Sequence, residues 1–208
     1  MIKFLLFFLI TCTPPANAHV NFDLRSEFDD SYTAELDPYA PRGLKVSYLS
    51  SVIVLPTIAG TPTGSGSGNY FKLGNKRFIL TAAHVVEEQQ EIFIMEKGHG
   101  MTPATVVYIN SETDIAVLVP NERLKYTKAI PFRRDINNQM GEKVYHCGHP
   151  AREGFHISEG LLTGTRNDVL LVNTFAWPGS SGSVLFDESG RVLGVLSAIR
   201  VDGPFGYP

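Results

Sequence analysis

Short apolar runs, each bounded by turn residues, recur along most of this chain and limit what it can fold into. From Val46 onward the runs are rich in β-branched and aromatic side chains, and Gly, Pro, Asn or Asp separate them. Runs of this kind predict β-strands, because branched and aromatic side chains pack well on a pleated surface. No helix-type apolar pattern extends beyond about two turns. The sequence therefore predicts an all-β protein.

The expected strands form two groups of about six, separated by a polar linker at 121–141. The first group is 46–55, 70–73, 77–81, 91–95, 104–109 and 114–119, and the second is 143–147, 155–163, 168–174, 183–187, 191–199 and 205–207. Gly74-Asn75 and Glu188–Gly190 predict hairpin turns, and the glycine-rich run 64–68 predicts a mobile or tightly turning connection. We expect two six-stranded antiparallel β-barrels, an N-terminal one over about 44–120 and a C-terminal one over 142–208.

Residues 1–18 have the pattern of an export signal. A basic residue precedes the apolar run Phe4–Ile10, and Ala16-Asn17-Ala18 fits a cleavage site. A run this short cannot cross about 30 Å of hydrocarbon, which takes roughly 20 residues. We expect cleavage after Ala18 and no membrane association afterwards. Lipidation at Cys12 is the alternative, although the threonine before that cysteine fits a lipidation motif poorly.

The remaining composition limits partners and cross-links. Residues 19–43 are acidic with few aliphatic side chains, so we expect an extended arm or a removable pro-segment there. The chain carries 18 basic and 21 acidic residues, which gives no basic surplus for nucleic acid. Of two cysteines only Cys147 remains after signal removal, so no internal disulfide is expected. Its apolar surroundings predict a buried, inert thiol. We also expect the protein to be a monomer.

Three short motifs carry candidate chemistry. His84 lies in Thr-Ala-Ala-His-Val-Val at the end of a strand, where reactive groups are often presented. Asp114 begins the run Ile-Ala-Val-Leu, so its carboxylate is drawn partly inside and needs an N–H partner. Ser181 lies in Trp-Pro-Gly-Ser-Ser-Gly-Ser, where flanking glycines allow a tight turn that exposes a hydroxyl beside backbone N–H groups. Each motif alone has a purely structural interpretation: a histidine packed in the core, an aspartate in a turn, or a glycine- and serine-rich surface turn. The occurrence of all three in one chain indicates a catalytic site.

In this order the three motifs resemble those of the trypsin-like serine peptidases, in style nearest to the HtrA/Deg-type and glutamyl-endopeptidase branches. Further segments resemble HtrA proteases: Gly64–Gly66 before the histidine strand, Cys147–Pro150, and Gly190–Val195 after the nucleophile motif. The resemblance extends from about Val46 to Pro208. One departure is Ser180, which stands where trypsins carry an aspartate for zymogen activation, so that switch is not expected. We also expect no PDZ domain.

The resemblance implies a secreted or periplasmic serine endopeptidase with its active site in the cleft between two barrels. Ser181 would be the nucleophile, His84 the general base and Asp114 the residue that orients it. Backbone N–H groups of Gly179 and Ser181 would form the oxyanion hole, and Ser197 would hydrogen-bond Asp114. Protein or peptide substrates are implied. A catalytically inactive barrel that acts as a binding module is the alternative, and esterase-type acyl transfer by the same residues also stays open.

The resemblance also suggests which residues contact substrate. The primary pocket would be lined by Phe175, Ala176, Trp177, Ala198 and Ile199. None of these carries a charge, so we expect cleavage after small or medium apolar residues.

One alternative reading of the second half is a metal site. His146, Cys147 and His149 have ligand side chains, but neighbours on a strand point to opposite faces. We expect neither a metal nor an organic cofactor.

Overall fold

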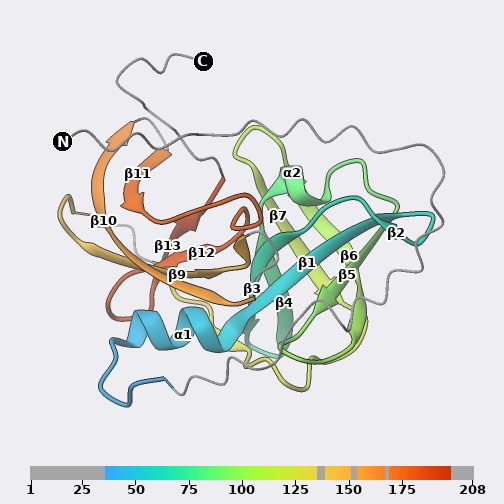
Figure 1. Ribbon diagram of the computed structural model, residues 1–208, viewed down its shortest axis with the longest axis horizontal. Coiled ribbons are helices and arrows are strands. Elements are labelled where there is room, and N and C mark those ends of the chain that lie inside the picture. Colours follow the sequence, from blue (N-terminus) through green and yellow to red (C-terminus); the bar gives the residue numbers. More distant parts are fainter. Residues whose placement is uncertain (1–35, 135–138, 151–153, 167–168, 198–208) are drawn as a thin grey trace, which may run out of the picture.

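The computed structural model describes residues 36–134, 139–150, 154–166 and 169–197, and consists mostly of β-strands in two sheets (Figure 1). Its elements, in chain order, are α1 (Arg42–Ser50), β1 (Ser51–Ile58), β2 (Thr61–Pro62), β3 (Gly66–Leu73), β4 (Lys76–Thr81), α2 (Ala83–Val86), β5 (Glu91–Met95), β6 (Met101–Asn110), β7 (Ile115–Pro120), β8 (Ile130–Pro131), β9 (Lys143–Gly148), β10 (His156–Arg166), β11 (Val169–Thr174), β12 (Val184–Phe186) and β13 (Val192–Val195). The expected export signal, and most of the acidic arm, lie outside the described residues.

The first sheet closes into a six-stranded barrel, as predicted. Its strands follow the order β1-β5-β6-β7-β4-β3, and β1 pairs with β3 to close the ring. The predicted hairpin at Gly74-Asn75 is confirmed, because Leu73 pairs with Lys76 across it. Apolar side chains from the strands fill the interior, among them Val52, Val54, Ile79, Ile94 and Leu118.

The second sheet is a half-barrel in the part of the chain that the structure describes. Five antiparallel strands follow the order β11-β10-β9-β12-β13 and leave the sheet open. The sixth strand expected at 205–207, and the end of the one expected at 191–199, lie outside the described residues. A second closed barrel therefore stays a prediction.

Aromatic side chains join the two sheets. Phe71 of the first sheet and Phe186 of the second are fully buried, with ring centroids 6.1 Å apart. The ring of Phe132 meets Phe71 edge-on at 5.4 Å, a geometry that aromatic quadrupoles favour. Val184 and Val192 complete this shared apolar cluster. Burial of these side chains fixes the second sheet against the first.

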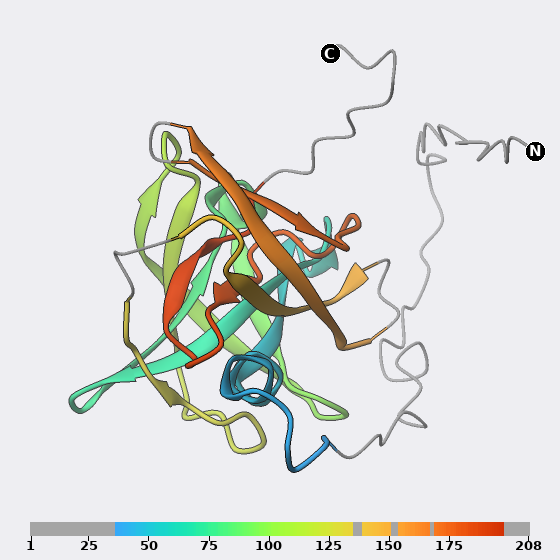
Figure 2. The same cartoon turned by 90° about the vertical axis from the view of Figure 1, so that its left-hand side faces the viewer.

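Residues 46–50 are helical, so the strand expected at 46–55 is wrong in its first half. The helix α1 buries Gly43, Ser47 and Ser50, which follow a helical spacing. Their small side chains let the helix axis approach β9 and β12 closely, and a Cβ on Gly43 would lie 2.0 Å from the Asp187 carbonyl oxygen. An apolar stripe predicts a buried helix, and here the buried stripe is made of small and polar residues instead. Figure 2 views this helix along its axis, against the strands.

A single buried amide connects α1 to both sheets. Asn69 on β3 is fully buried, and its Nδ2 donates to the Ser47 carbonyl at 3.0 Å and to Ser50 Oγ at 2.9 Å. Its Oδ1 accepts the N–H of Val184 on β12 at 3.0 Å. Each of these groups is shielded from water, so each needs the amide as its partner.

Replacing Asn69 with alanine should lower the free energy of unfolding by about 3 kcal/mol or more, because several buried polar groups lose their partner at about 1–3 kcal/mol each. Urea unfolding followed by circular dichroism measures the loss. The matched control is Asn75→Ala, in the exposed hairpin turn, which should change stability by no more than about 0.5 kcal/mol. Equal losses in the two variants would contradict this role of the buried amide.

Candidate active site

His84 is presented to solvent by a short helix between buried neighbours. Strand β4 runs into Ala82 and Ala83, both fully buried, and Val85 behind them is 8% exposed. The imidazole of His84 is 48% exposed. The small alanines let the chain turn inside the barrel wall, and only the histidine side chain leaves it.

Asp114 holds this imidazole by two hydrogen bonds. The His84 backbone N–H donates to Oδ1 at 2.9 Å, and ring Nδ1–H donates to Oδ2 at 2.8 Å. With the Nδ1 proton held by the carboxylate, a neutral imidazole keeps Nε2 free to accept a proton. Asp114 itself has φ of 52°, a left-handed conformation that is uncommon for a residue other than glycine and that recurs at functional sites.

The Asp114 carboxylate is kept ionised by its partners. Burial alone would raise its pKa, but hydrogen bonds from Ser197 Oγ and from His84, with the charge of His84, hold the pKa below the usual range. Ser197 Oγ donates to Oδ2, the oxygen that also faces the imidazole. The result is a continuous chain of hydrogen bonds from Ser197 through Asp114 to His84.

Ser181 follows a tight turn whose geometry its sequence dictates. The Ser180 N–H donates to the Trp177 carbonyl at 2.8 Å, and Gly179 has φ of 102°. Proline at the second position and glycine at the third are the residues that a type II turn requires. Among the described residues, neither the N–H of Gly179 nor that of Ser181 donates a hydrogen bond, and the Ser181 hydroxyl also has no partner. This turn therefore offers two N–H donors and a hydroxyl together.

Ser67 on β3 ties the turn to the first barrel. Its N–H donates to the Ser181 carbonyl and its Oγ to the Gly179 carbonyl, both at 2.7 Å. Thr81, at the end of β4, donates through Oγ1 to the Ser67 carbonyl at 2.7 Å. Since β4 leads directly to His84, these bonds place the serine turn against the segment that carries the histidine.

Gly182 is needed for that close approach. It has φ of 88°, and a Cβ there would lie 2.1 Å from the Ser67 carbonyl oxygen and 2.3 Å from Thr81 Oγ1. Any side chain would push the turn away from the end of β4. Ser67 was not singled out as a site residue in the sequence, and the one signal was the glycine-rich run in which it lies.

That glycine-rich run is not a mobile connection over residues 66–68, where it forms the start of β3. A Cβ on Gly66 would lie 2.6 Å from Val85, and one on Gly68 would lie 2.8 Å from Ile79. Glycine at these positions lets the strand pack closely against α2 and β4. The local sequence cannot reveal this, because α2 and β4 lie elsewhere in the chain.

The predicted pocket residues are only partly described. Phe175 and Trp177 are 60% and 45% exposed, and Ala176 is half-buried. Ala198 and Ile199 lie outside the described residues. The Phe175 carbonyl accepts a hydrogen bond from His146 Nε2 at 3.1 Å, so a buried histidine on β9 supports this segment.

His146, Cys147 and His149 are buried, and Ser51 Oγ donates to the Cys147 carbonyl at 3.0 Å. His149 Nε2 lies 3.3 Å from Ser51 Oγ, and its ring packs edge-on against Phe155. Burial raises the pKa of the Cys147 thiol to about 11, so the thiol stays protonated and unreactive. In the described part of the chain, no group of three or more His, Cys, Asp or Glu could hold a metal ion. Within the same residues no helix has the length and apolar character that crossing a membrane takes.

Comparisons with known proteins agree on one family. Residues 66–195 match the family model of the trypsin-like peptidase domain. Protease Do-like 1 of Arabidopsis thaliana chloroplasts is 27% identical over 150 residues, 66% of this chain and 34% of the relative. A probable periplasmic DegP-like serine endoprotease of Bartonella henselae is 27% identical over 146 residues, covering 66% and 28%. This chain thus spans about a third of the length of these relatives.

A solved structure shares the fold. The serine endoprotease from Yersinia pestis superimposes with a TM-score of 0.62 at 23% identity, over 74% of this chain and 55% of the other.

Acid should destabilise this protein below pH 6.5 because of its two buried histidines. Burial lowers the pKa of His146 to about 4 and that of His149 to about 3, from an ordinary 6.5. Between pH 6.5 and about 4 the unfolded chain therefore binds protons that the folded chain does not. Stability is full above pH 6.5 and falls with acidification by roughly 1.4 kcal/mol per pH unit for each histidine.

Urea unfolding at several pH values measures this slope. His149→Gln should remove about half of it, whereas His99→Gln, at an exposed position, should leave it unchanged. A slope that is the same in both variants would show that other groups cause the acid sensitivity.

Proposed function

Because this chain belongs to the trypsin-like peptidase family, we propose that it is a serine endopeptidase that cleaves peptide bonds through Ser181, His84 and Asp114. One observation carries the proposal: Asp114 orients His84 through two hydrogen bonds, with Ser197 behind it, while Ser67 and Thr81 tie the Ser181 turn to the same strand end. A packing histidine would need neither the carboxylate nor the exposed Nε2 side.

The proposed mechanism gives each of these groups a role. Ser181 Oγ attacks the scissile carbonyl while His84 Nε2 takes its proton, and the C–N bond then breaks as the imidazolium returns that proton to the leaving amine. Asp114 stabilises the imidazolium. The N–H groups of Gly179 and Ser181 donate to the developing oxyanion, a role worth about 2.7–4 kcal/mol per donor in other hydrolases. Water then hydrolyses the acyl-enzyme by the same steps.

We also propose where the protein acts, how its chain is divided and what it binds. A periplasmic or secreted location follows from the signal pattern in residues 1–18, and a DegP-like relative is named as periplasmic. Residues 19–43 would form the arm or pro-segment, 44–120 and 142–208 the two barrels, and 121–141 the linker. Substrates would be proteins or peptides bound by a monomer.

Ser181→Ala should abolish hydrolysis, by at least about a thousandfold, with the fold intact. A fluorophosphonate probe and a casein-cleavage gel test activity, and urea unfolding tests the fold. The control is Ser180→Ala, whose buried hydroxyl contacts only the Trp177 N–H at 3.3 Å and should be dispensable. An active Ser181→Ala protein beside an inactive Ser180→Ala protein would show that the nucleophile is the other serine. Two active variants would mean that neither serine is used.

Cleavage should occur mainly after small or medium apolar residues such as Ala, Val and Leu. The predicted pocket segment Phe175–Trp177 carries no charge that could pair with a buried charged side chain, and burying an unpaired charge costs several kcal/mol. Cleavage sites in a denatured proteome measure the preference, with the Ser181→Ala protein as the control for contaminating proteases. A majority of cuts after Arg, Lys, Asp or Glu would rule out this pocket assignment.

A further inference from the structure

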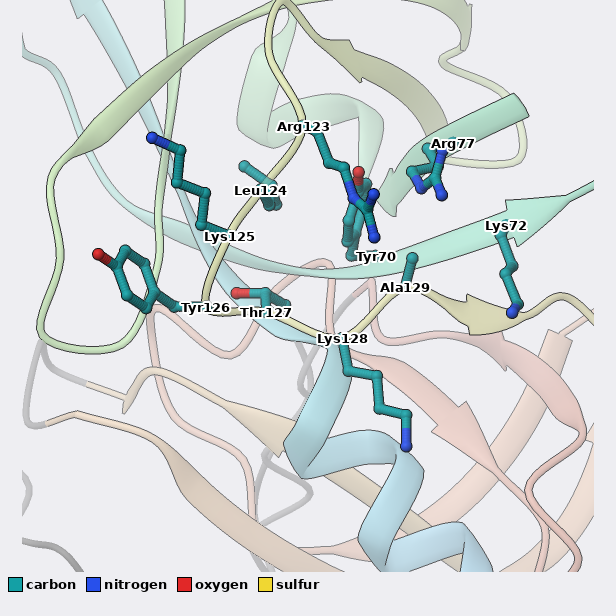
Figure 3. A pocket seen from close by; sticks show the side chains of 10 residues that line it. All are labelled: Tyr70, Lys72, Arg77, Arg123, Leu124, Lys125, Tyr126, Thr127, Lys128 and Ala129. Carbon is teal, nitrogen blue, oxygen red and sulfur yellow. The ribbon is translucent and has the colours of Figure 1, made fainter. Parts of the chain in front are cut away.

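A basic hollow lies at the end of β4 that is opposite to His84. It has a volume of about 660 Å³ and is bordered by β3, the start of β4 and the segment 123–129 (Figure 3). Arg77 is near the first residue of β4, whereas Thr81, its last residue, leads to the histidine helix. The hollow is therefore separate from the candidate active site.

Five cationic side chains line this hollow: Lys72, Arg77, Arg123, Lys125 and Lys128. None of them forms a salt bridge with another described residue. The neighbouring carboxylate of Glu96 is buried and is already used, because it accepts the backbone N–H groups of residues 125, 126 and 127 at 2.5 to 3.0 Å. The five cationic side chains thus outnumber this neighbouring carboxylate, and the hollow keeps an excess of positive charge.

Two of these cations face each other across a strand pair. Lys72 and Arg77 are directly opposed in the register of β3 and β4. Like charges in opposed positions destabilise a hairpin unless an anion lies between or beside them. The neighbouring pair, Leu73 and Lys76, lies on the other face of the strands, so the charges are concentrated on the side of the hollow.

Buried donors without partners point into the same space. The Tyr70 hydroxyl belongs to a residue that is 1% exposed, and its O–H has no acceptor among the described residues; Arg77 Nε is likewise buried and unsatisfied there. Burial raises the pKa of Tyr70, against a hydrogen bond from the Leu124 backbone and the charges of Arg77 and Arg123, so the phenol remains a donor. Figure 3 shows the Arg123 guanidinium beside the phenol, while Lys125 points away from it. Buried polar groups normally find partners, so an external acceptor is missing here.

We propose that this hollow binds a phosphate or sulfate group of a small anionic ligand. Two guanidinium groups and a phenol approach from different strands and from the 123–129 segment, and a tetrahedral oxyanion has enough oxygens to accept from all three. Lys72 and Lys128 also line the hollow and add positive charge. A carboxylate carries a single charge and its two oxygens lie in one plane, so it fits donors that come from three directions less well than a doubly charged tetrahedral oxyanion.

Titration calorimetry of the whole protein with pyrophosphate and with sulfate tests the proposal, with acetate at matched ionic strength as the reference anion. We expect saturable binding of pyrophosphate or sulfate with one site and none with acetate. Arg77→Gln and Arg123→Gln should each weaken it roughly tenfold or more, because each removes a charged hydrogen bond. The charge-matched control Lys76→Gln, on the other face of β4, should bind normally. If Lys76→Gln weakened anion binding equally, the loss would reflect the net charge of the protein rather than this site, and the proposal would be overturned.

Two further measurements keep the test decisive if an arginine variant does not fold. Tyr70→Phe removes only the unsatisfied hydroxyl, so it should fold and yet bind the anion several-fold more weakly. In the unaltered protein, pyrophosphate should shift the NMR amide signals of residues 123–128 and leave those of 179–182 in place. Shifts confined to other surfaces, or no saturable binding, would refute the proposal. Ser181→Ala should bind the anion fully, so failure of either proposal is seen independently.

Discussion

The hydrogen bonds of Ser67 are the interaction on which the candidate site depends. One buried residue uses its N–H and its hydroxyl to hold the carbonyls of Ser181 and Gly179, and its own carbonyl receives Thr81. The same hydroxyl accepts the N–H of His149 at 3.0 Å. Thr81 and His149 are buried and the turn at Gly179 and Ser181 is half-buried, a setting in which an unmade hydrogen bond is costly and the hydrogen-bond geometry is restricted. The serine turn is thus positioned by the first barrel as well as by the end of its own sheet, where the Gly182 N–H donates to the Leu196 carbonyl at 2.8 Å.

Apolar packing between the two sheets holds them close enough for these hydrogen bonds to form. The shared cluster around Phe71 and Phe186 holds the sheets together without directional preference, and Asn69 adds direction by joining α1, β3 and β12. Burial of aromatic surface supplies most of the stabilisation. The polar contacts select one relative placement of the sheets, because a small shift would leave several buried groups without partners.

Sequence alone could locate the candidate chemistry but not its supports. His84, Asp114 and Ser181 were found because each sits in a short motif whose residue types are demanded locally by a strand end or a tight turn. No local pattern marks Ser67 or Asn69, and His146 is visible only as a possible metal ligand, since a buried polar residue gains its importance from partners that lie 14 to 115 residues away in the chain. The helix α1 was read as a strand for a related reason. Its buried face is made of Gly43, Ser47 and Ser50, which no hydrophobic periodicity reveals.

The proposed base and nucleophile lie in different halves of the chain, and this has a consequence for synthesis of the protein. Under the proposed mechanism the base and its carboxylate belong to the first barrel, whereas the nucleophile arrives later in synthesis and is shaped by contact with that barrel. A ribosome-bound chain that has completed the first barrel has His84 and Asp114 but no serine to activate. A cut in the linker at 121–141 followed by separation of the halves would likewise leave two inert pieces. Under the proposed mechanism, reactivity is therefore a property of the two docked halves, and separating them would end it.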